Sequence, residues 1–86
     1  MKHFDYTIKD ASGIHARPAG QISKIAKEYA DTVIIVEREG KTAKATQLMK
    51  LMGLGVKEGD VITVTVEGPS EVEASIALRN FFQNNL

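Results

Sequence analysis

The sequence lacks cysteine, so neither disulfide bonds nor thiolate metal sites can contribute to its fold. A chain without such cross-links is held together by packing alone, which fits a reducing compartment. An excess of charge is missing too, because eleven Lys and Arg residues balance eleven Asp and Glu residues. General nucleic-acid binders usually carry a basic excess, so the composition disfavours that class of protein.

Long apolar runs are also absent. No segment approaches the roughly 20 consecutive apolar residues that a membrane-spanning helix needs. The first ten residues, MKHFDYTIKD, do not contain the apolar core of a signal peptide. We therefore expect a soluble cytoplasmic protein with no direct membrane insertion. A hydrophobic share of 43% over 86 residues suffices for one modest core, and we expect a single domain over residues 1–86.

Four segments have the alternating or β-branched pattern of strands. A tight turn at Glu39-Gly40 joins the second and third segments as a hairpin. In the last segment three aliphatic side chains, Ile62, Val64 and Val66, share one face. The predicted strands are Phe4–Ile8, Thr32–Val36, Lys41–Ala45 and a strand within EGDVITVTVEG, which begins at Glu58.

The first amphipathic helix begins after a loop at Asp10–Gly13. Pro18 lies in its first turn, where a helix tolerates proline because the missing N–H is no loss. Its buried face is predicted to consist of Ala19, Ile22, Ala26 and Tyr29.

Two further helices follow along the chain. A short one runs over Leu48–Met52, with Thr46 as its N-cap and a glycine, residue 53 or 55, at its end. The last lies within PSEVEASIALRNFFQNNL and opens on a capping box of Ser70 and Glu73. Its buried face is predicted to consist of Ala74, Ala77, Leu78 and Phe81.

The predicted order of elements is therefore β-α-β-β-α-β-α. Four short strands in this order form one antiparallel sheet, and the three helices cover one of its faces. The fold class is α+β, a two-layer open-faced sandwich.

A histidine stands directly before the first helix, in the run SGIHARPAG at residues 12–20. Helix N-termini present unpaired N–H groups and a partial positive charge, and they bind phosphate for that reason. A neutral imidazole has the nitrogen lone pair that a nucleophile needs. A phosphoryl group on His15 would face the helix N-terminus, and the Arg17 guanidinium would supply further donors. The run is consistent with a histidine that is transiently phosphorylated.

Other interpretations of His15 remain open from spacing alone. Polar residues at helix N-termini commonly do no more than cap, and a plain binding module could carry His15 without using its chemistry. A metal site is disfavoured, because the only other histidine is His3 and no ligand cluster flanks His15. A hydrolase triad is disfavoured because no nucleophile elbow is present. We expect no cofactor and no independent enzyme.

Two segments resemble one known family. GIHARPA resembles the active-site motif of HPr, the family of histidine-containing phosphocarriers in the bacterial phosphoenolpyruvate:sugar phosphotransferase system. LMKLMGLGVKEGDVITVTVEG is similar to the second helix, glycine turn and fourth strand of the same family. The order of elements also agrees, so the resemblance covers essentially the whole chain.

The resemblance implies a role for the site residues. His15 would accept a phosphoryl group from enzyme I, at the expense of phosphoenolpyruvate, and pass it to the IIA components of sugar transporters. Arg17 matches the arginine that accompanies the active histidine, and Pro18 matches the proline at the helix start. A monomer suits a carrier that must present one face freely to successive partners.

The second helix of the family lies beside the active histidine and contacts both enzyme I and the IIA proteins. The apolar side chains of the short predicted helix cannot all face the sheet, and an exposed apolar patch usually marks a contact site. Methionine adapts to several partners. The candidate docking residues are Gly20, Leu48, Met49, Leu51 and Met52.

One position departs from the pattern of many family members. Gln47 stands where they carry a regulatory serine, and it has no hydroxyl to phosphorylate. Regulation through an HPr kinase is therefore in doubt. The alternative function is a regulatory or phosphorelay paralogue that acts by docking to partner proteins instead of feeding sugar transport.

Overall fold

The computed structural model describes all 86 residues and has the element order predicted from the sequence. The bounds of the elements differ from the predicted ones by a few residues. The elements are β1 Lys2–Thr7, α1 Ala16–Glu28, β2 Val33–Arg38, β3 Lys41–Lys44, α2 Leu48–Gly53, β4 Val61–Glu67 and α3 Glu71–Asn85.

The four strands form one antiparallel sheet in the order β1-β4-β2-β3. The last strand of the chain, β4, thus lies inside the sheet, between β1 and β2. One row of paired residues runs across all four strands, with Phe4 opposite Val64, Val64 opposite Val36, and Val36 opposite Ala43. All four are buried, because side chains in register point to the same face of a sheet.

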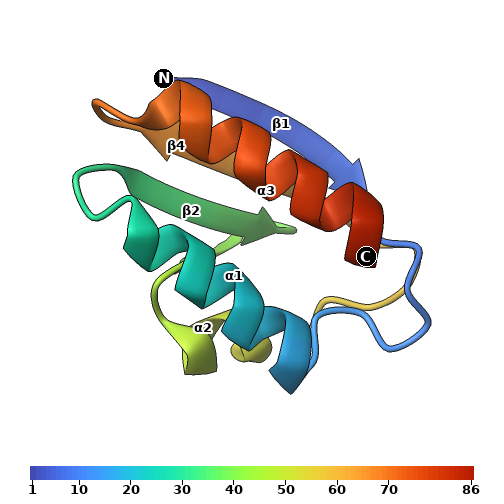
Figure 1. Cartoon of the computed structure of the whole chain (residues 1–86). Helices are drawn as coiled ribbons and strands as arrows, with labels where there is room; N and C mark the ends of the chain where they lie inside the picture. Colours follow the sequence, from blue (N-terminus) through green and yellow to red (C-terminus); the bar gives the residue numbers. More distant parts are fainter.

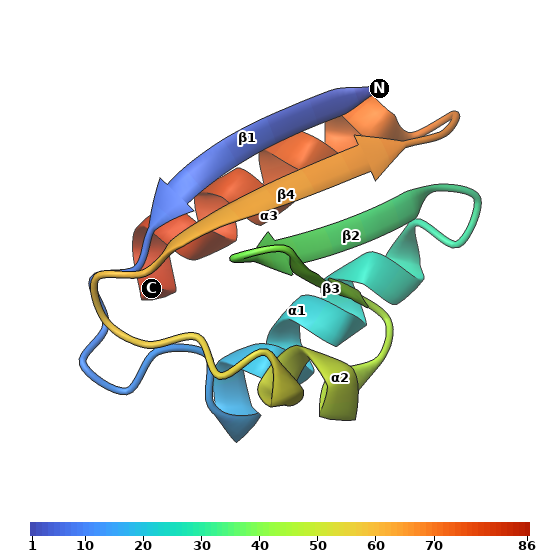
Figure 2. The same cartoon turned by 180° about the vertical axis from the view of Figure 1, so that it is seen from behind.

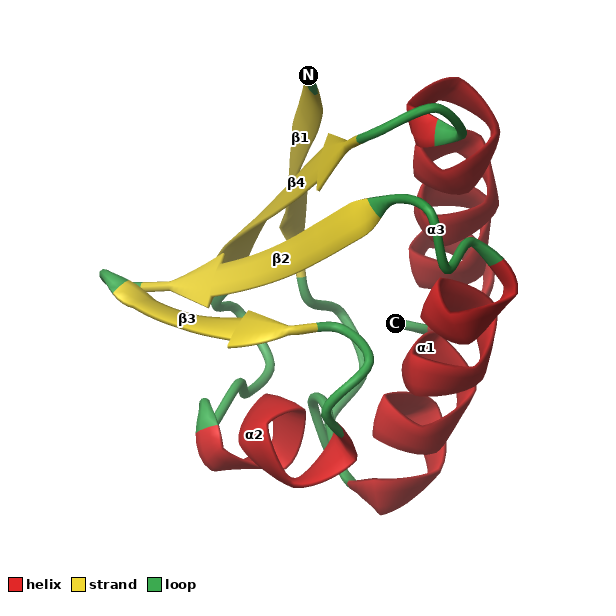
Figure 3. Cartoon of the chain, turned by 90° about the vertical axis from the view of Figure 1, so that its left-hand side faces the viewer, coloured by secondary structure: helices red, strands yellow, loops and turns green.

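The helices lie on that buried side of the sheet (Figure 1 and Figure 3). Helices α1 and α3 pack against each other, and the short α2 packs against α1 and β3. The opposite face of the sheet carries no helix and is turned toward the viewer in Figure 2. The predicted α+β two-layer open-faced sandwich is confirmed.

A cluster of 20 buried hydrophobic residues fills the space between the layers. Phe82 is the largest fully buried side chain, and its ring packs 5.9 Å from the Phe4 ring and 5.7 Å from the Tyr6 ring. On α3, Ala74 and Leu78 are buried as predicted, whereas Ala77 and Phe81 are only partly buried. The buried stripe of α3 advances by four residues at each step, from residue 74 to 78 to 82, and so reaches Phe82.

The predicted capping box of α3 is not formed. Ser70 is the N-cap, but its hydroxyl donates to Asp31 Oδ2 at 3.2 Å and caps no helical N–H. The nearby carboxylate contact comes from Glu71, which accepts the Gly68 N–H at 3.2 Å, and Glu73 is exposed. Tertiary contact with the α1–β2 loop thus replaces the local cap.

The starts of the other two helices also differ from the predictions. Helix α1 begins at Ala16, two residues before Pro18, which therefore is its third residue and still lies in the first turn. Helix α2 has Gln47 as its N-cap, while Thr46 lies one residue outside and accepts the Ser23 hydroxyl on its carbonyl at 3.1 Å. This bond joins the start of α2 to α1. Gly55, with φ +66°, follows the end of α2.

Two irregular segments lie against each other at one end of the sheet: residues 8–14, before α1, and residues 54–60, between α2 and β4. Ile14 N–H donates to Val56 O at 3.2 Å, Ile8 N–H donates to Asp60 O at 2.9 Å, and Gly59 N–H donates to Ile8 O at 2.8 Å. These bonds fix the chain immediately before α1.

Gly13 allows this close approach. Its φ is +65°, and a Cβ at this position would lie 2.1 Å from Val56 O. No side chain larger than hydrogen fits there without moving the backbone.

Arg38, the last residue of β2, fastens segment 54–60 from its other side. Its Nε donates to Asp60 Oδ2 at 2.7 Å and its Nη1 donates to Leu54 O at 3.2 Å. Asp60 Oδ2 also accepts the Lys57 N–H at 2.9 Å. The Lys57 N–H, followed by the Arg38 guanidinium, holds the pKa of the Asp60 carboxyl below its ordinary value.

We expect Gly20→Ala to stabilise the protein by about 1 kcal/mol, the difference in helix propensity between the two residues. Gly20 lies inside α1, and nothing lies within 4 Å of the position where its Cβ would stand. The free energy of unfolding from chemical denaturation measures the change.

Gly13→Ala provides the opposite control for the same measurement. A positive φ and the collision with Val56 O should lower the free energy of unfolding by at least about 1 kcal/mol. A Gly13→Ala variant as stable as the wild type would contradict the described packing of the two segments.

Candidate functional site

His15 occupies the N-cap of α1, where the sequence predicts it. Its backbone is extended, with φ −95° and ψ −170°, and its carbonyl accepts the first helical N–H, from Ala19, at 3.0 Å. The side chain is exposed and makes no capping hydrogen bond. The imidazole is therefore free to react.

The positive end of α1 is not neutralised by any residue of the helix itself. The first turn contains no acidic residue. The N–H groups of Ala16 and Arg17 have no hydrogen-bond partner, and Pro18 has no N–H to offer. Two backbone donors and the helix dipole thus point outward beside His15.

An open hollow of about 350 Å³ lies at this end of α1. Arg17 is exposed and has neither an ion pair nor a hydrogen bond, so its guanidinium is available to a ligand. The hollow is lined by Asp10, His15, Arg17, Pro18, Gln21 and Asn85. The structure therefore brings together all three residues that the sequence placed at the start of the helix.

Three lining residues were missed from the sequence. Gln21 lies one turn after Arg17, and the spacing of four residues on a helix could have identified it. Asp10 comes from the preceding loop, where its Oδ1 accepts the Ser12 N–H at 2.7 Å. Asn85 belongs to the last turn of α3, and only the packing of α3 beside α1 brings it here, so no local pattern in the sequence marks it.

These groups suit a tetrahedral anion carried on the imidazole. The Arg17 guanidinium and the free N–H groups are donors. Asp10 is the one acidic residue that lines the hollow, and its Oδ1 accepts the Ser12 N–H. No group of three potential metal ligands exists in the structure, and His3 lies on β1 opposite Thr65, outside the hollow. None of the helices is long and apolar enough to cross a membrane.

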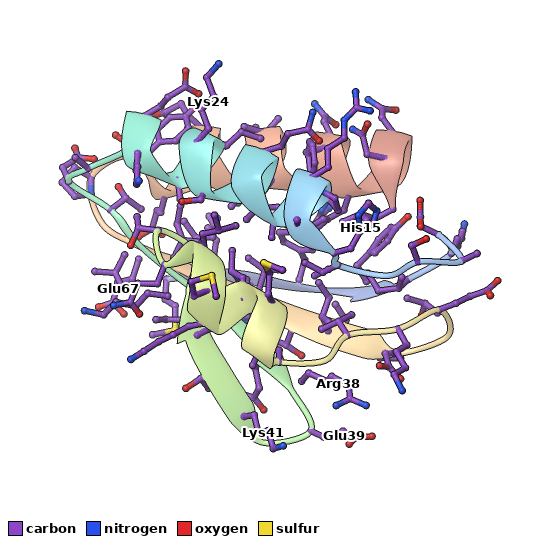
Figure 4. All side chains as sticks on the ribbon, turned by 90° about the horizontal axis from the view of Figure 1, so that it is seen from below. His15, Lys24, Arg38, Glu39, Lys41 and Glu67 are labelled. Atoms are coloured by element: carbon purple, nitrogen blue, oxygen red, sulfur yellow. The ribbon has the colours of Figure 1, made fainter.

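Helix α2 lies beside α1 in Figure 4 and presents part of its apolar surface outward. Met49 is 75% exposed, Leu48 is 39% exposed and Met52 is partly buried. We call Leu48, Met49 and Met52 the α2 patch.

Leu51 does not belong to this patch, which corrects its prediction as a docking residue. It is completely buried, because it lies on the side of this short amphipathic helix that faces the core. Gly20 is partly exposed, and no atom stands over the place of its missing side chain. Gln47, at the N-cap of α2, is exposed.

Comparison with known proteins relates this site to a family. The family model described as the phosphorylation site of the PTS HPr component matches residues 2–84. Phosphocarrier protein HPr of Mycoplasma genitalium is 34% identical over 85 residues, which cover 99% of this chain and 97% of the relative.

Two solved structures from Thermoanaerobacter tengcongensis extend the likeness to the fold. The structure of HPr-C-His has a TM-score of 0.90 and 36% identity, and the match covers 96% of this chain and 92% of the other. The structure of an HPr dimer has a TM-score of 0.76 and 36% identity, with 98% and 95% covered. Together with the family match over nearly every residue, these similarities show that the chain belongs to the HPr family of the phosphotransferase system.

Proposed function

We propose that this protein is a phosphocarrier that accepts a phosphoryl group on His15 from phosphorylated enzyme I and passes it to the IIA components of sugar transporters. The observation that carries the proposal is the exposed imidazole of His15, which makes no capping bond, at a helix whose first turn has no acidic residue, with a free Arg17 beside it. Membership of the HPr family supports the same chemistry.

In the first transfer, a ring nitrogen of His15 attacks phosphorus with its lone pair. The N–P bond forms as the bond between phosphorus and the donor atom breaks, and the donor keeps that electron pair. The Arg17 guanidinium and the free N–H groups at the start of α1 stabilise the charge on the phosphoryl oxygens. The second transfer reverses these steps, with the IIA component as acceptor.

The exposure of the site suits a carrier. A hollow open to solvent leaves room for the donor and then the acceptor to approach the same imidazole. We assign docking of both partners to the α2 patch, with Gly20 on the neighbouring helix as a close-approach point. The two methionines of the α2 patch can adapt their shape to different partners.

The chain itself carries the group and does not complete a reaction alone, so we propose no enzymatic activity and no cofactor. We also propose that it acts as a monomer in the cytoplasm, since the hollow and the α2 patch must both be accessible. A Thermoanaerobacter tengcongensis relative was solved as an HPr dimer, so the molecular mass of this protein in solution tests the proposed monomer. Gln47 gives no acceptor for a regulatory phosphorylation at its position.

The second candidate is a regulatory or phosphorelay paralogue that docks to partner proteins without feeding sugar transport. The absence of a hydroxyl at Gln47 is the observation that keeps it open. It would retain the α2 patch but not transfer to a IIA component. Discharge of the phosphorylated protein by purified IIA components distinguishes the two functions.

Incubation with phosphoenolpyruvate, magnesium and purified enzyme I should add one phosphate to the wild type and none to His15→Ala. Intact-mass measurement detects the addition. The modification should disappear in acid, because protonation of the ring nitrogen weakens the N–P bond. An acid-stable phosphate, or a modified His15→Ala, would move the acceptor to a hydroxyl and contradict the proposal.

Arg17→Ala should slow phosphorylation of His15 by roughly 10-fold to 100-fold, since a donor to the charge in the transition state is lost. The free energy of unfolding should change little, because Arg17 contacts no other residue through its charge. Single-turnover kinetics compared with a denaturation curve separates the two effects. A wild-type rate in this variant would remove Arg17 from the mechanism.

Met49→Ala and Leu51→Ala should differ in what they impair. Met49 is exposed, so its truncation should raise the KM of enzyme I for this protein while stability is retained. Leu51 is fully buried, so its truncation should cost about 2–5 kcal/mol of stability. If Met49→Ala left the KM for both enzyme I and a IIA component unchanged, the α2 patch would not be the docking surface.

A further inference from the structure

Arg38 is the only side chain that bonds to both ends of segment 54–60. It reaches Leu54 O, at the end of α2, and Asp60 Oδ2, just before β4, at 3.2 and 2.7 Å. The side chain is 20% exposed, so its charge-assisted bonds are largely shielded from bulk water. The contact with Glu39 is longer, at 3.9 Å, and Glu39 is mostly exposed, which leaves Asp60 as the main ionic partner.

The middle of the same segment supports the residues before His15. Val56 O accepts the Ile14 N–H and stands directly against Gly13, while Asp60 and Gly59 pair with Ile8. Figure 4 places Arg38 at the end of β2 and His15 at the start of α1, with segment 54–60 between them. A chain of direct contacts thus leads from the guanidinium to the residue adjacent to His15.

Segment 54–60 follows directly after α2, and residues 8–14, which lead to His15, pack against it. Arg38 therefore fixes both the end of the helix that carries the α2 patch and the segment against which the residues before His15 pack. A partner seated on the α2 patch finds the imidazole at a set position only if these two parts keep their relative placement.

We infer that Arg38 is a positioning residue for phosphoryl transfer, which acts through segment 54–60 to hold His15 in register with the α2 patch. The inference rests on the proposed function of His15. Its mechanism needs no contact between Arg38 and the phosphoryl group, because misplacement of reacting atoms by about 1 Å is enough to slow a transfer strongly.

Arg38→Gln is the test variant, and Arg79→Gln is its matched control. Arg79 lies on α3 with its guanidinium carbon 5.0 Å from the centre of the Phe4 ring, and it touches neither segment 54–60 nor the hollow. Both variants remove one cation by the same substitution, from a partly buried site in Arg38 and an exposed one in Arg79. Kinetics are measured with enzyme I and phosphoenolpyruvate at a temperature where denaturation curves show both variants fully folded.

With Arg38→Gln as the phosphoryl acceptor, the kcat of enzyme I should fall by roughly 10-fold or more with little change in its KM for the acceptor, because the α2 patch is still present but His15 is displaced. Amide exchange of Ile14 should accelerate more than that of the β4 amides, which report global unfolding. Arg79→Gln should leave kcat and the relative exchange of Ile14 unchanged. Arg38→Lys should recover part of kcat, since a single ammonium can pair with Asp60 but does not match both bonds of the fork.

Asp60→Asn provides a second route to the same result. It keeps oxygen and side-chain size but removes the negative charge that Arg38 pairs with, so it should lower kcat in the same direction as Arg38→Gln. The double variant, Arg38→Gln with Asp60→Asn, should be no slower in phosphoryl transfer than the slower of the two single variants, because both changes remove the Arg38–Asp60 ion pair.

The possible failures are distinguishable. If the wild type gains no phosphate, the proposed function of His15 is wrong. If the wild type is phosphorylated but Arg38→Gln shows an unchanged kcat and unchanged Ile14 exchange, the role of Arg38 is overturned. If Arg38→Gln lowered only the stability and left kcat unchanged, the ion pair of Arg38 would have a structural role alone and the inference would likewise be wrong.

Discussion

The contact between two backbone segments, residues 8–14 and 54–60, is the constraint on which the rest of the site depends. Gly13 rests against Val56 O, and the N–H of Ile14 donates to the same oxygen. This contact joins the residue before His15 to the chain that leaves α2. In the proposed function, chemistry and docking lie on different helices, and the contact between their flanking loops joins them into one surface.

Helix α1 carries its reactive residue at the end where a helix usually receives stabilising carboxylates or a capping side chain. Here the first turn has no acidic residue and the N-cap side chain makes no hydrogen bond. Pro18 occupies a position in the first turn where a backbone N–H would have no partner within the helix. The helix itself therefore leaves the field at its N-terminus uncompensated. The stability of α1 comes from its buried face, which includes Ala19, Ile22 and Ala26.

Periodicity alone accounts for most of the fold that the sequence predicts. Alternation in β4 identified Ile62, Val64 and Val66, all of which are fully buried. Local rules failed where tertiary contacts replaced them. Ser70 bonds to Asp31 across the fold in place of a capping box, and the buried ring on α3 is that of Phe82, which packs against the Phe4 ring. Leu51, predicted as a docking residue, is buried because a six-residue helix has few side chains with which to pack against the core.

The candidate site shows the same division between local and distant information. His15 and Arg17 are consecutive features of one motif and were visible in the sequence. Asn85 comes from the far end of the chain, and its presence at the hollow follows only from the packing of α3. The order of strands has a further consequence for synthesis. Because β4 lies between β1 and β2, the first strand has no neighbour in the sheet until residues 61–67 have been made. The sheet can therefore be completed only late in translation, and long-range pairing of this kind forms more slowly than the local contacts of helices.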